Sequence, residues 1–113
     1  MDSTIRSVGK VMVLDLSEHI SPEDGGARLH SKVERILAEG HLRILINMEH
    51  VPYVDSRGLR DLLAAKKAAL MAGAEIKLLR PRKRIYGLLT RVNLSKVFEI
   101  YEDEQAAIQS FRV

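Results

Sequence analysis

The segment at residues 42–48, Leu-Arg-Ile-Leu-Ile-Asn-Met, constrains the fold of this chain more than any other part of the sequence. Its apolar run is almost continuous, which is typical of an interior strand in a sheet that helices cover on both faces. Around it, segments rich in β-formers alternate with segments whose apolar residues recur at helical spacing. We therefore expect an α/β fold, built as a single domain over residues 1–113 around one core.

The strands are expected to form a mixed but mostly parallel five-stranded sheet. The first two strands form a hairpin across Gly9-Lys10, a plausible tight turn. Three strand–helix–strand units then follow one another, which favours parallel strands with right-handed connections and leaves the first strand antiparallel at one edge. The predicted strands are residues 5–8, 11–16, 42–48, 75–79 and 97–101.

About four helices accompany these strands. Ser21-Pro22 opens the first helix and Gly40 ends it, Ala72-Gly73 ends the second, and Pro81 opens the third. Residues 103–111 form the closing helix. In the second helix Arg60, Lys66 and Lys67 are expected to face outward. The expected inward residues are Leu29, Val33, Ile36 and Leu37 in the first helix, Leu59, Leu62, Leu63 and Leu70 in the second, and Ile85, Leu88, Leu89 and Val92 in the third.

The pair Asp55-Ser56 lies between the apolar strand and the second helix. A Ser or Asp at a helix start can accept hydrogen bonds from the unpaired backbone N–H groups of the first turn. A phosphate on Ser56 would in addition meet the positive end of the helix dipole. In an arbitrary protein such a pair is mostly a helix cap, so the motif alone leaves a cap and a switch site open.

The formal net charge of +3 hides a strong asymmetry along the chain. Residues 57–91 contain ten basic and two acidic residues, a net charge of +8, and include the run Arg80-Pro81-Arg82-Lys83-Arg84. The surface beside Ser56 should therefore attract anionic partners. A merely solvated basic surface would have the same composition.

Several classes of function lack support in the sequence. The four His residues have no metal-ligand spacing and Cys is absent, so we expect no metal site. Gly25-Gly26 belongs to no phosphate-binding loop and Ser56 to no G-x-S-x-G turn, so we expect neither a cofactor nor hydrolytic catalysis. The basic run has no interleaved aromatic residues for base stacking, which argues against direct nucleic-acid binding.

The sequence contains no signal peptide and no apolar segment long enough to span a bilayer. We therefore expect a cytoplasmic protein without membrane insertion, and a monomer, because charge is the only strong exposed feature. Four aromatic residues are expected to pack in the fold rather than to form a binding platform: Tyr53, Tyr86, Phe98 and Tyr101.

Taken in order, several local motifs resemble the STAS domain family over nearly the whole chain. Within that family the chain most resembles bacterial anti-sigma factor antagonists. The motifs are Asp55-Ser56-x-Gly58-Leu59 after the apolar strand, Ala72-Gly73 before the next strand, Leu88-Leu89 to Val92-Asn93-Leu94 at the exit of the third helix, and residues 97–101 before an acidic helix.

This resemblance implies a STAS-type single domain that acts as a regulatory binding protein and not as an enzyme. In such antagonists the unphosphorylated form binds an anti-sigma factor that is also a serine protein kinase. The kinase phosphorylates the serine directly after the Asp, which is Ser56 here, and a phosphatase resets the switch. The expected partner-binding residues are Asp55, Ser56, Arg57, Gly58, Arg60 and Lys67.

Two positions depart from the family pattern. Arg57 stands where the family usually has Ser or Thr, and Arg60 stands where it usually has Gly. Both add bulk and positive charge, which favours a partner with an acidic patch, and a guanidinium can also pair with a phosphate on Ser56. The two residues mildly favour an alternative, a non-switching STAS docking subunit of a lipid transporter or of a signalling scaffold. A further alternative is a small anion- or nucleotide-binding module that uses the basic block.

Overall fold

A single sheet of five strands, in the spatial order β1-β2-β3-β4-β5, organises the chain. The computed structural model describes residues 3–17 and 26–111. β1 is antiparallel to β2, whereas β2, β3, β4 and β5 are parallel to one another, as the sequence predicted. The strands are β1 (Ser3–Val8), β2 (Val11–Leu16), β3 (Arg43–Asn47), β4 (Glu75–Leu79) and β5 (Ile100–Tyr101).

The predicted hairpin between the first two strands is confirmed. Val8 pairs with Val11, so that Gly9 and Lys10 alone form the loop. Gly9 has a φ of 60°, a conformation that glycine adopts without steric cost and that tight hairpin turns require.

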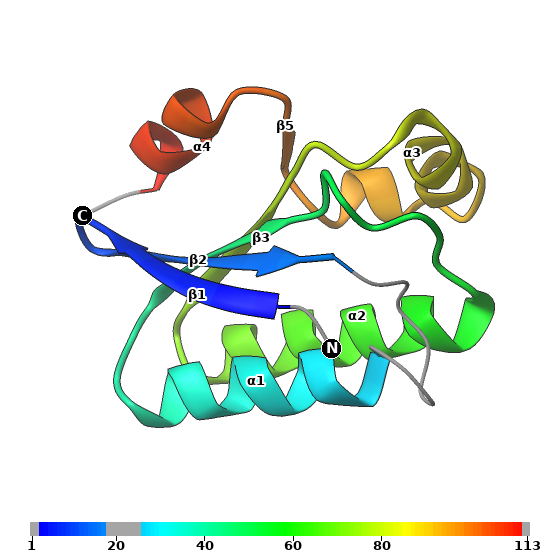
Figure 1. Cartoon of the computed structure of the whole chain (residues 1–113). Coiled ribbons are helices and arrows are strands. Elements are labelled where there is room, and N and C mark those ends of the chain that lie inside the picture. The colour runs from blue at the N-terminus through cyan, green and yellow to red at the C-terminus, as the bar shows by residue number, and fades with distance from the viewer. Residues whose placement is uncertain (1–2, 18–25, 112–113) are drawn as a thin grey trace.

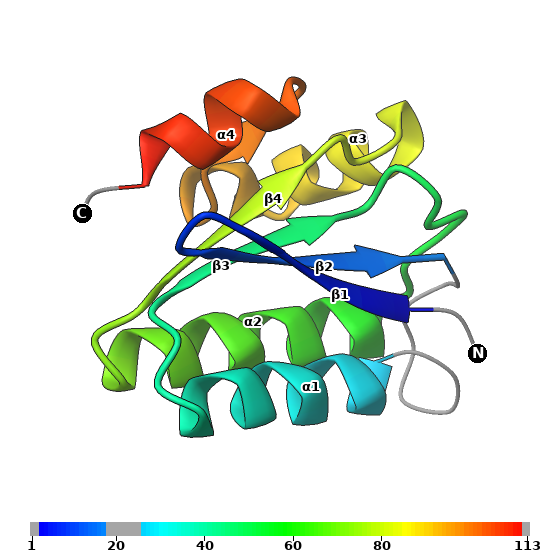
Figure 2. The same cartoon turned by 60° about the vertical axis from the view of Figure 1, so that its left-hand side comes forward.

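In residues 3–17 and 26–111, four α-helices and one short 3₁₀ helix surround the sheet. α1 and α2 lie side by side on one face, and α4 lies on the other face (Figures 1 and 2). Their bounds are α1 (Gly26–Ala38), α2 (Ser56–Met71), α3 (Lys83–Arg91), η1 (Leu94–Lys96) and α4 (Glu104–Ser110). None of these helices is long and apolar enough to cross a membrane, among the residues that the structure describes.

The core is divided by the sheet into a large and a small cluster of buried apolar residues. The large cluster lies between the sheet and α1, α2 and α3, and the small one lies under α4. β3 contributes to both, because Ile44 and Ile46 face the large cluster and Leu45 faces the small one. This explains the nearly continuous apolar run of β3, and it confirms the prediction that helices cover both faces.

The predicted last strand at residues 97–101 is wrong for most of its length. β5 contains only Ile100 and Tyr101, and η1 precedes it. The N–H groups of Val97 and Phe98 both donate to the carbonyl of Leu94, at 3.0 and 3.1 Å, so these two residues continue a turn. Phe98 is still buried, because the turn directs its ring into the large cluster.

Other predicted boundaries also change, by one or two residues in β1, β3 and α4. α3 begins at Lys83 after the cap residue Arg82, and not at Pro81. Val92 follows the end of this helix and is 46% exposed, so it does not share the buried face of Ile85 and Leu89 as predicted. The predicted start of the first helix at residues 21–24 lies outside the described residues.

Candidate functional site

The candidate site is built around the start of α2. β3 ends at Asn47, and Val51 and Val54 bury their side chains between that strand and the helix. Asp55 is the N-cap of α2, and its Oδ1 accepts a hydrogen bond from the N–H of Gly58 at 2.7 Å. The cap role that the sequence left open between Asp55 and Ser56 therefore falls to Asp55.

Ser56 is the first residue of α2, and it is exposed. Because Asp55 provides the cap, the hydroxyl of Ser56 is not required for that role. An attached phosphate would lie at the N-terminal end of a sixteen-residue helix, where the helix dipole favours negative charge.

The other predicted binding residues lie where α2 meets solvent, with one exception. Arg57, Arg60 and Lys67 are exposed, and Asp55 is half-buried. Gly58 is buried, and its backbone N–H donates to the capping carboxylate of Asp55.

Leu63 and Leu70 were predicted to face inward, and this prediction is wrong. Leu63 is 37% exposed, and Leu70 is 63% exposed. The buried face of α2 consists of Gly58, Leu59, Leu62, Ala65 and Ala69. The small residues on that face let α2 pack closely on its neighbours, so the two further leucines are left on the solvent side.

The outward face of α2 is therefore a mixed apolar and basic surface. With 3.6 residues per turn, Ser56, Arg60, Leu63, Lys67 and Leu70 follow one another along the same side of the helix. Met71, at the helix end, is 81% exposed and extends this side. We call this surface the α2 face and define it as Ser56, Arg60, Leu63, Lys67, Leu70 and Met71. The sequence analysis did not predict the apolar residues of this face. The available signal was Ala65 and Ala69, which form part of the buried face and leave Leu63 and Leu70 outside it.

A neighbouring helix adds further positive charge beside the site. A small cavity of ≈ 170 Å³ is lined by Tyr53 and Val54 from the loop before Asp55, and by Arg84 and Arg91 from α3. The basic block of the sequence thus meets the start of α2 from two helices. Tyr53 is 46% exposed here, so its prediction as a packing residue is wrong.

The position of α2 is held by a polar contact with α1. Oδ2 of Asp61 accepts a hydrogen bond from the backbone N–H of His30 at 3.2 Å. Burial raises the pKa of the Asp61 carboxyl, and the hydrogen bond from His30 opposes that rise. Asp61 lies between the helices and therefore positions the α2 face without belonging to it.

The described residues contain no group of three or more His, Asp or Glu side chains that could hold a metal ion. The fold and the exposed helix start together define a small α/β domain with one charged and apolar helix face. The chain belongs to the STAS domain family, whose pattern matches residues 5–107.

Solved structures with the same fold have low sequence identity to this chain. A putative anti-sigma factor antagonist from Thermotoga maritima is 20% identical, with a TM-score of 0.89 over 98% of this chain and 95% of that one. The Bacillus cell fate determinant SpoIIAA in its phosphorylated form is 18% identical, with a TM-score of 0.74 over 98% of this chain and 100% of that one.

A sulfate transporter family protein from Wolinella succinogenes is 14% identical, with a TM-score of 0.72 over 92% of this chain and 86% of that one. No curated protein sequence matches the chain significantly. These likenesses confirm the STAS fold that the sequence predicted.

Proposed function

We propose that this chain is an anti-sigma factor antagonist that works by partner switching. In this proposal its unphosphorylated form binds an anti-sigma factor that is also a serine protein kinase, and phosphorylation of Ser56 releases it. A phosphatase removes the phosphate and restores binding. The observation that carries the proposal is the exposed Ser56 at the start of α2, directly after a capping Asp55 and at one end of the α2 face.

The structure of SpoIIAA in a phosphorylated form has the same fold, which supports a phosphorylated STAS domain as a precedent. STAS membership also favours a binding protein over an enzyme.

The chemistry of the α2 face indicates what the partner surface must offer. In a complex, Leu63, Leu70 and Met71 would pack against apolar side chains of the partner, and Arg60 and Lys67 would pair with its carboxylates. A partner helix or strand that carries both aliphatic and acidic residues would be complementary to the α2 face.

Phosphorylation of Ser56 would reverse the charge at one end of this face. A phosphate adds about −1.5 to −2 charges at neutral pH, next to the carboxylate of Asp55. An acidic partner would then be repelled from the start of α2. Arg57 and Arg60 lie within a turn of Ser56 and are able to pair with part of that charge, so the repulsion here is weaker than it would be without them.

The experiment that tests the proposal compares Ser56→Asp with Ser56→Ala by titration against the anti-sigma factor kinase encoded by the native host. Ser56→Ala should retain the affinity of the wild type, and Ser56→Asp should bind about tenfold or more weakly because of the added charge. Thermal unfolding of both variants provides the control for correct folding. Equal affinities would exclude a switch at Ser56.

A second candidate function is a STAS docking subunit that does not switch, in a lipid transporter or a signalling scaffold. Arg57 and Arg60 favour it, because they alter the surface at which the family's regulators are modified. The similar fold of the sulfate transporter family protein is compatible with it. Copurification of a membrane transporter with wild-type protein that carries no phosphate would favour this function.

A further inference from the structure

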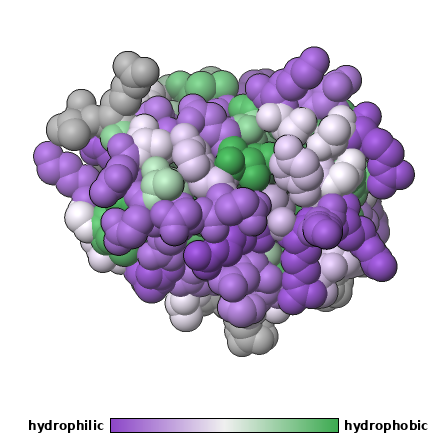
Figure 3. All heavy atoms as spheres, turned by 90° about the horizontal axis from the view of Figure 1, so that it is seen from above, coloured by the Kyte–Doolittle hydropathy of each residue, from purple (hydrophilic) through white to green (hydrophobic). Residues whose placement is uncertain are grey.

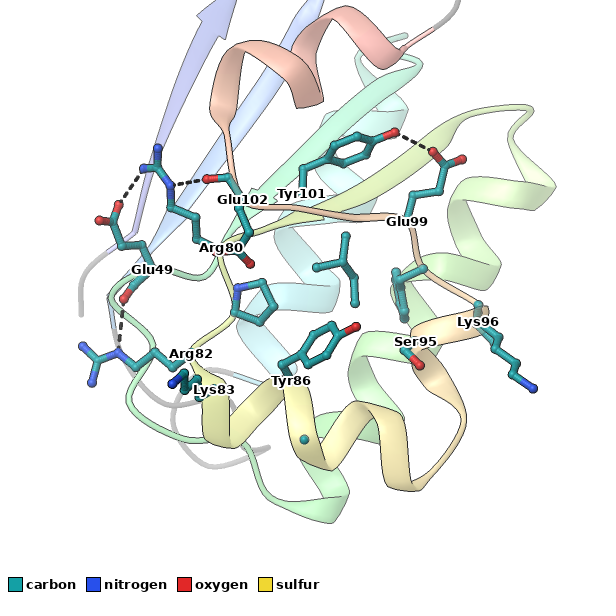
Figure 4. Close-up of a pocket in the computed structure, with 15 residues that line it drawn as sticks. Glu49, Arg80, Arg82, Lys83, Tyr86, Ser95, Lys96, Glu99, Tyr101 and Glu102 are labelled. Atoms are coloured by element: carbon teal, nitrogen blue, oxygen red, sulfur yellow. Dashed lines mark hydrogen bonds and ion pairs between the residues drawn. The ribbon is translucent and has the colours of Figure 1, made fainter.

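A large surface hollow lies away from α2. It is a groove of ≈ 1320 Å³ between α3 and η1 on one side and β5 on the other, and no residue of α2 lines it. Figure 3 shows the side of the molecule that carries α3 and α4, which is mostly hydrophilic around a small apolar patch. In Figure 4, Tyr86 from α3 and Tyr101 from β5 lie on opposite sides of the groove.

β5 is an edge strand whose outer backbone groups face this groove. The carbonyls of Glu99 and Tyr101 accept hydrogen bonds from the N–H groups of Leu78 in β4 and of Arg80 just after it, at 3.0 and 2.8 Å. Because successive residues of a strand direct their backbone groups to opposite sides, the N–H and carbonyl of Ile100 point away from β4. Ile100 also lines the groove, so the sheet offers one donor and one acceptor there to a further strand.

Gly87 leaves open space on the α3 side of this groove. It lies inside α3 and lines the groove, yet a Cβ at this position would meet no atom of this chain within 4 Å. Glycine is a poor helix former, and nothing inside the described chain requires it here. Its missing side chain leaves room above the helix for an occupant that approaches closely.

The charges of the groove indicate the nature of that occupant. Its carboxylates at Glu49 and Glu99 are engaged, the first by Arg80 at 3.2 Å and the second by Lys77 at 3.3 Å and by the hydroxyl of Tyr101 at 2.9 Å. In contrast, three cations on the α3 and η1 side have no carboxylate partner among the described residues: Arg82, Lys83 and Lys96. Among the described acids that line the groove, Glu102 alone has no cation partner.

We propose that this groove binds an extended, acidic peptide segment of a partner protein, which adds to the edge of β5. Ile100 supplies the backbone hydrogen bonds, Tyr86 and Val97 contact apolar side chains, and the three cations attract carboxylates. The exposure of Tyr86, 47%, corrects its prediction as a packing residue and fits this role. The proposal rests on none of the residues of the α2 face.

The test uses a display library of random peptides of about seven residues, panned at low salt against the full wild-type chain. Enrichment of sequences that alternate acidic with β-branched or aromatic residues is expected. The most enriched peptide is then synthesised and titrated by NMR. It should shift the amide of Ile100 and protect it from hydrogen exchange, and its affinity should fall as salt is raised.

Variants distinguish this groove from other surfaces. Gly87→Ala should raise the melting temperature by about 3 °C, since alanine favours the helix, and should weaken peptide binding about tenfold because its methyl group projects into the space that a closely approaching peptide would use. Lys83→Glu should weaken binding about fivefold, whereas Lys10→Glu, the same charge change in the β1–β2 turn, should not.

Several results would overturn the proposal. They are the absence of any acidic enrichment, equal binding by the wild type and Gly87→Ala, and a peptide that leaves the amide of Ile100 unchanged. Because every readout uses a displayed or synthetic peptide, none of them depends on whether Ser56 is phosphorylated.

Discussion

At the scale of single residues, the helix cap and the proposed switch at the start of α2 belong to two different side chains. Asp55 stabilises the helix by accepting the hydrogen bond from Gly58, which leaves the hydroxyl of Ser56 exposed and chemically available. The same separation recurs further along the helix, where Leu62 is fully buried and Leu70 is 63% exposed. Two leucines of one helix therefore have different roles.

The two leucines give a matched pair of variants. Leu70→Gln should weaken binding of the partner about tenfold, because an apolar contact is lost, and should change the free energy of unfolding by less than about 0.5 kcal/mol. Leu62→Ala should lower the free energy of unfolding by about 3 kcal/mol through the cavity that it leaves. Urea unfolding and partner titration measure the two effects. A large loss of stability in Leu70→Gln would show that this leucine is structural.

At the scale of elements, a polar cluster joins strands and a helix that are distant in sequence. Arg6 of β1 contacts Asp15 of β2 at 3.1 Å and Glu104 of α4 at 2.9 Å, and Asn47 of β3 donates to Asp15 at 2.8 Å. Burial alone would raise the pKa of Asp15, but the hydrogen bonds from Arg6 and Asn47 outweigh it and hold the pKa below its ordinary value. The ionised Asp15 thus adds the contacts with Arg6 and Asn47 to the backbone pairing of these strands.

This direction of shift predicts how stability depends on pH. A carboxyl with a lowered pKa in the folded state stabilises the fold above its unfolded pKa of about 4, and this contribution is lost as pH falls through the folded pKa. The wild type should therefore lose more stability between neutral pH and about pH 3 than Asp15→Asn does. Urea unfolding at both pH values measures the difference. Equal losses in the two proteins would show that Asp15 does not stabilise the fold by its charge.

Sequence patterns predicted the elements well where local signals and packing agree. Gly9 and the apolar run of β3 identified the hairpin and the central strand, because a tight turn and burial on both faces leave clear patterns. They failed at β5, where Val97 and Phe98 look like strand residues but belong to a turn that buries Phe98 from another direction. They failed on the α2 face because helical spacing alone does not show whether an apolar residue lies in the core or on an exposed surface.

At the scale of the whole molecule, the sheet separates the proposed switch from the second core. The α2 face lies on one side, and α4 closes the small cluster on the other (Figure 1). Phe111 is the largest residue of that small cluster, and the ammonium group of the buried Lys77 lies 4.6 Å from the centre of its ring. Lys77 also donates to the carbonyl of Ser110 at 3.0 Å, which fixes the end of α4 to β4.

Phe111→Ala should therefore lower the free energy of unfolding by about 3 kcal/mol, within a single cooperative transition. Partner binding through the α2 face should not change at temperatures where the variant is folded, because the sheet lies between the two sites. Calorimetry and the same partner titration check both expectations. Separate melting of the two clusters, or weaker partner binding by the folded variant, would contradict this view of the molecule.

In the proposed function, phosphorylation of Ser56 controls what binds to the α2 face. The most direct test is phosphosite mapping by mass spectrometry on this protein purified from its native host, with copurifying proteins identified in the same preparation. The proposed function predicts a phosphate on Ser56 in part of the protein and an anti-sigma factor kinase bound only to the part without it. An unmodified Ser56 across several growth conditions, with a transporter or scaffold protein bound instead, would contradict the switch.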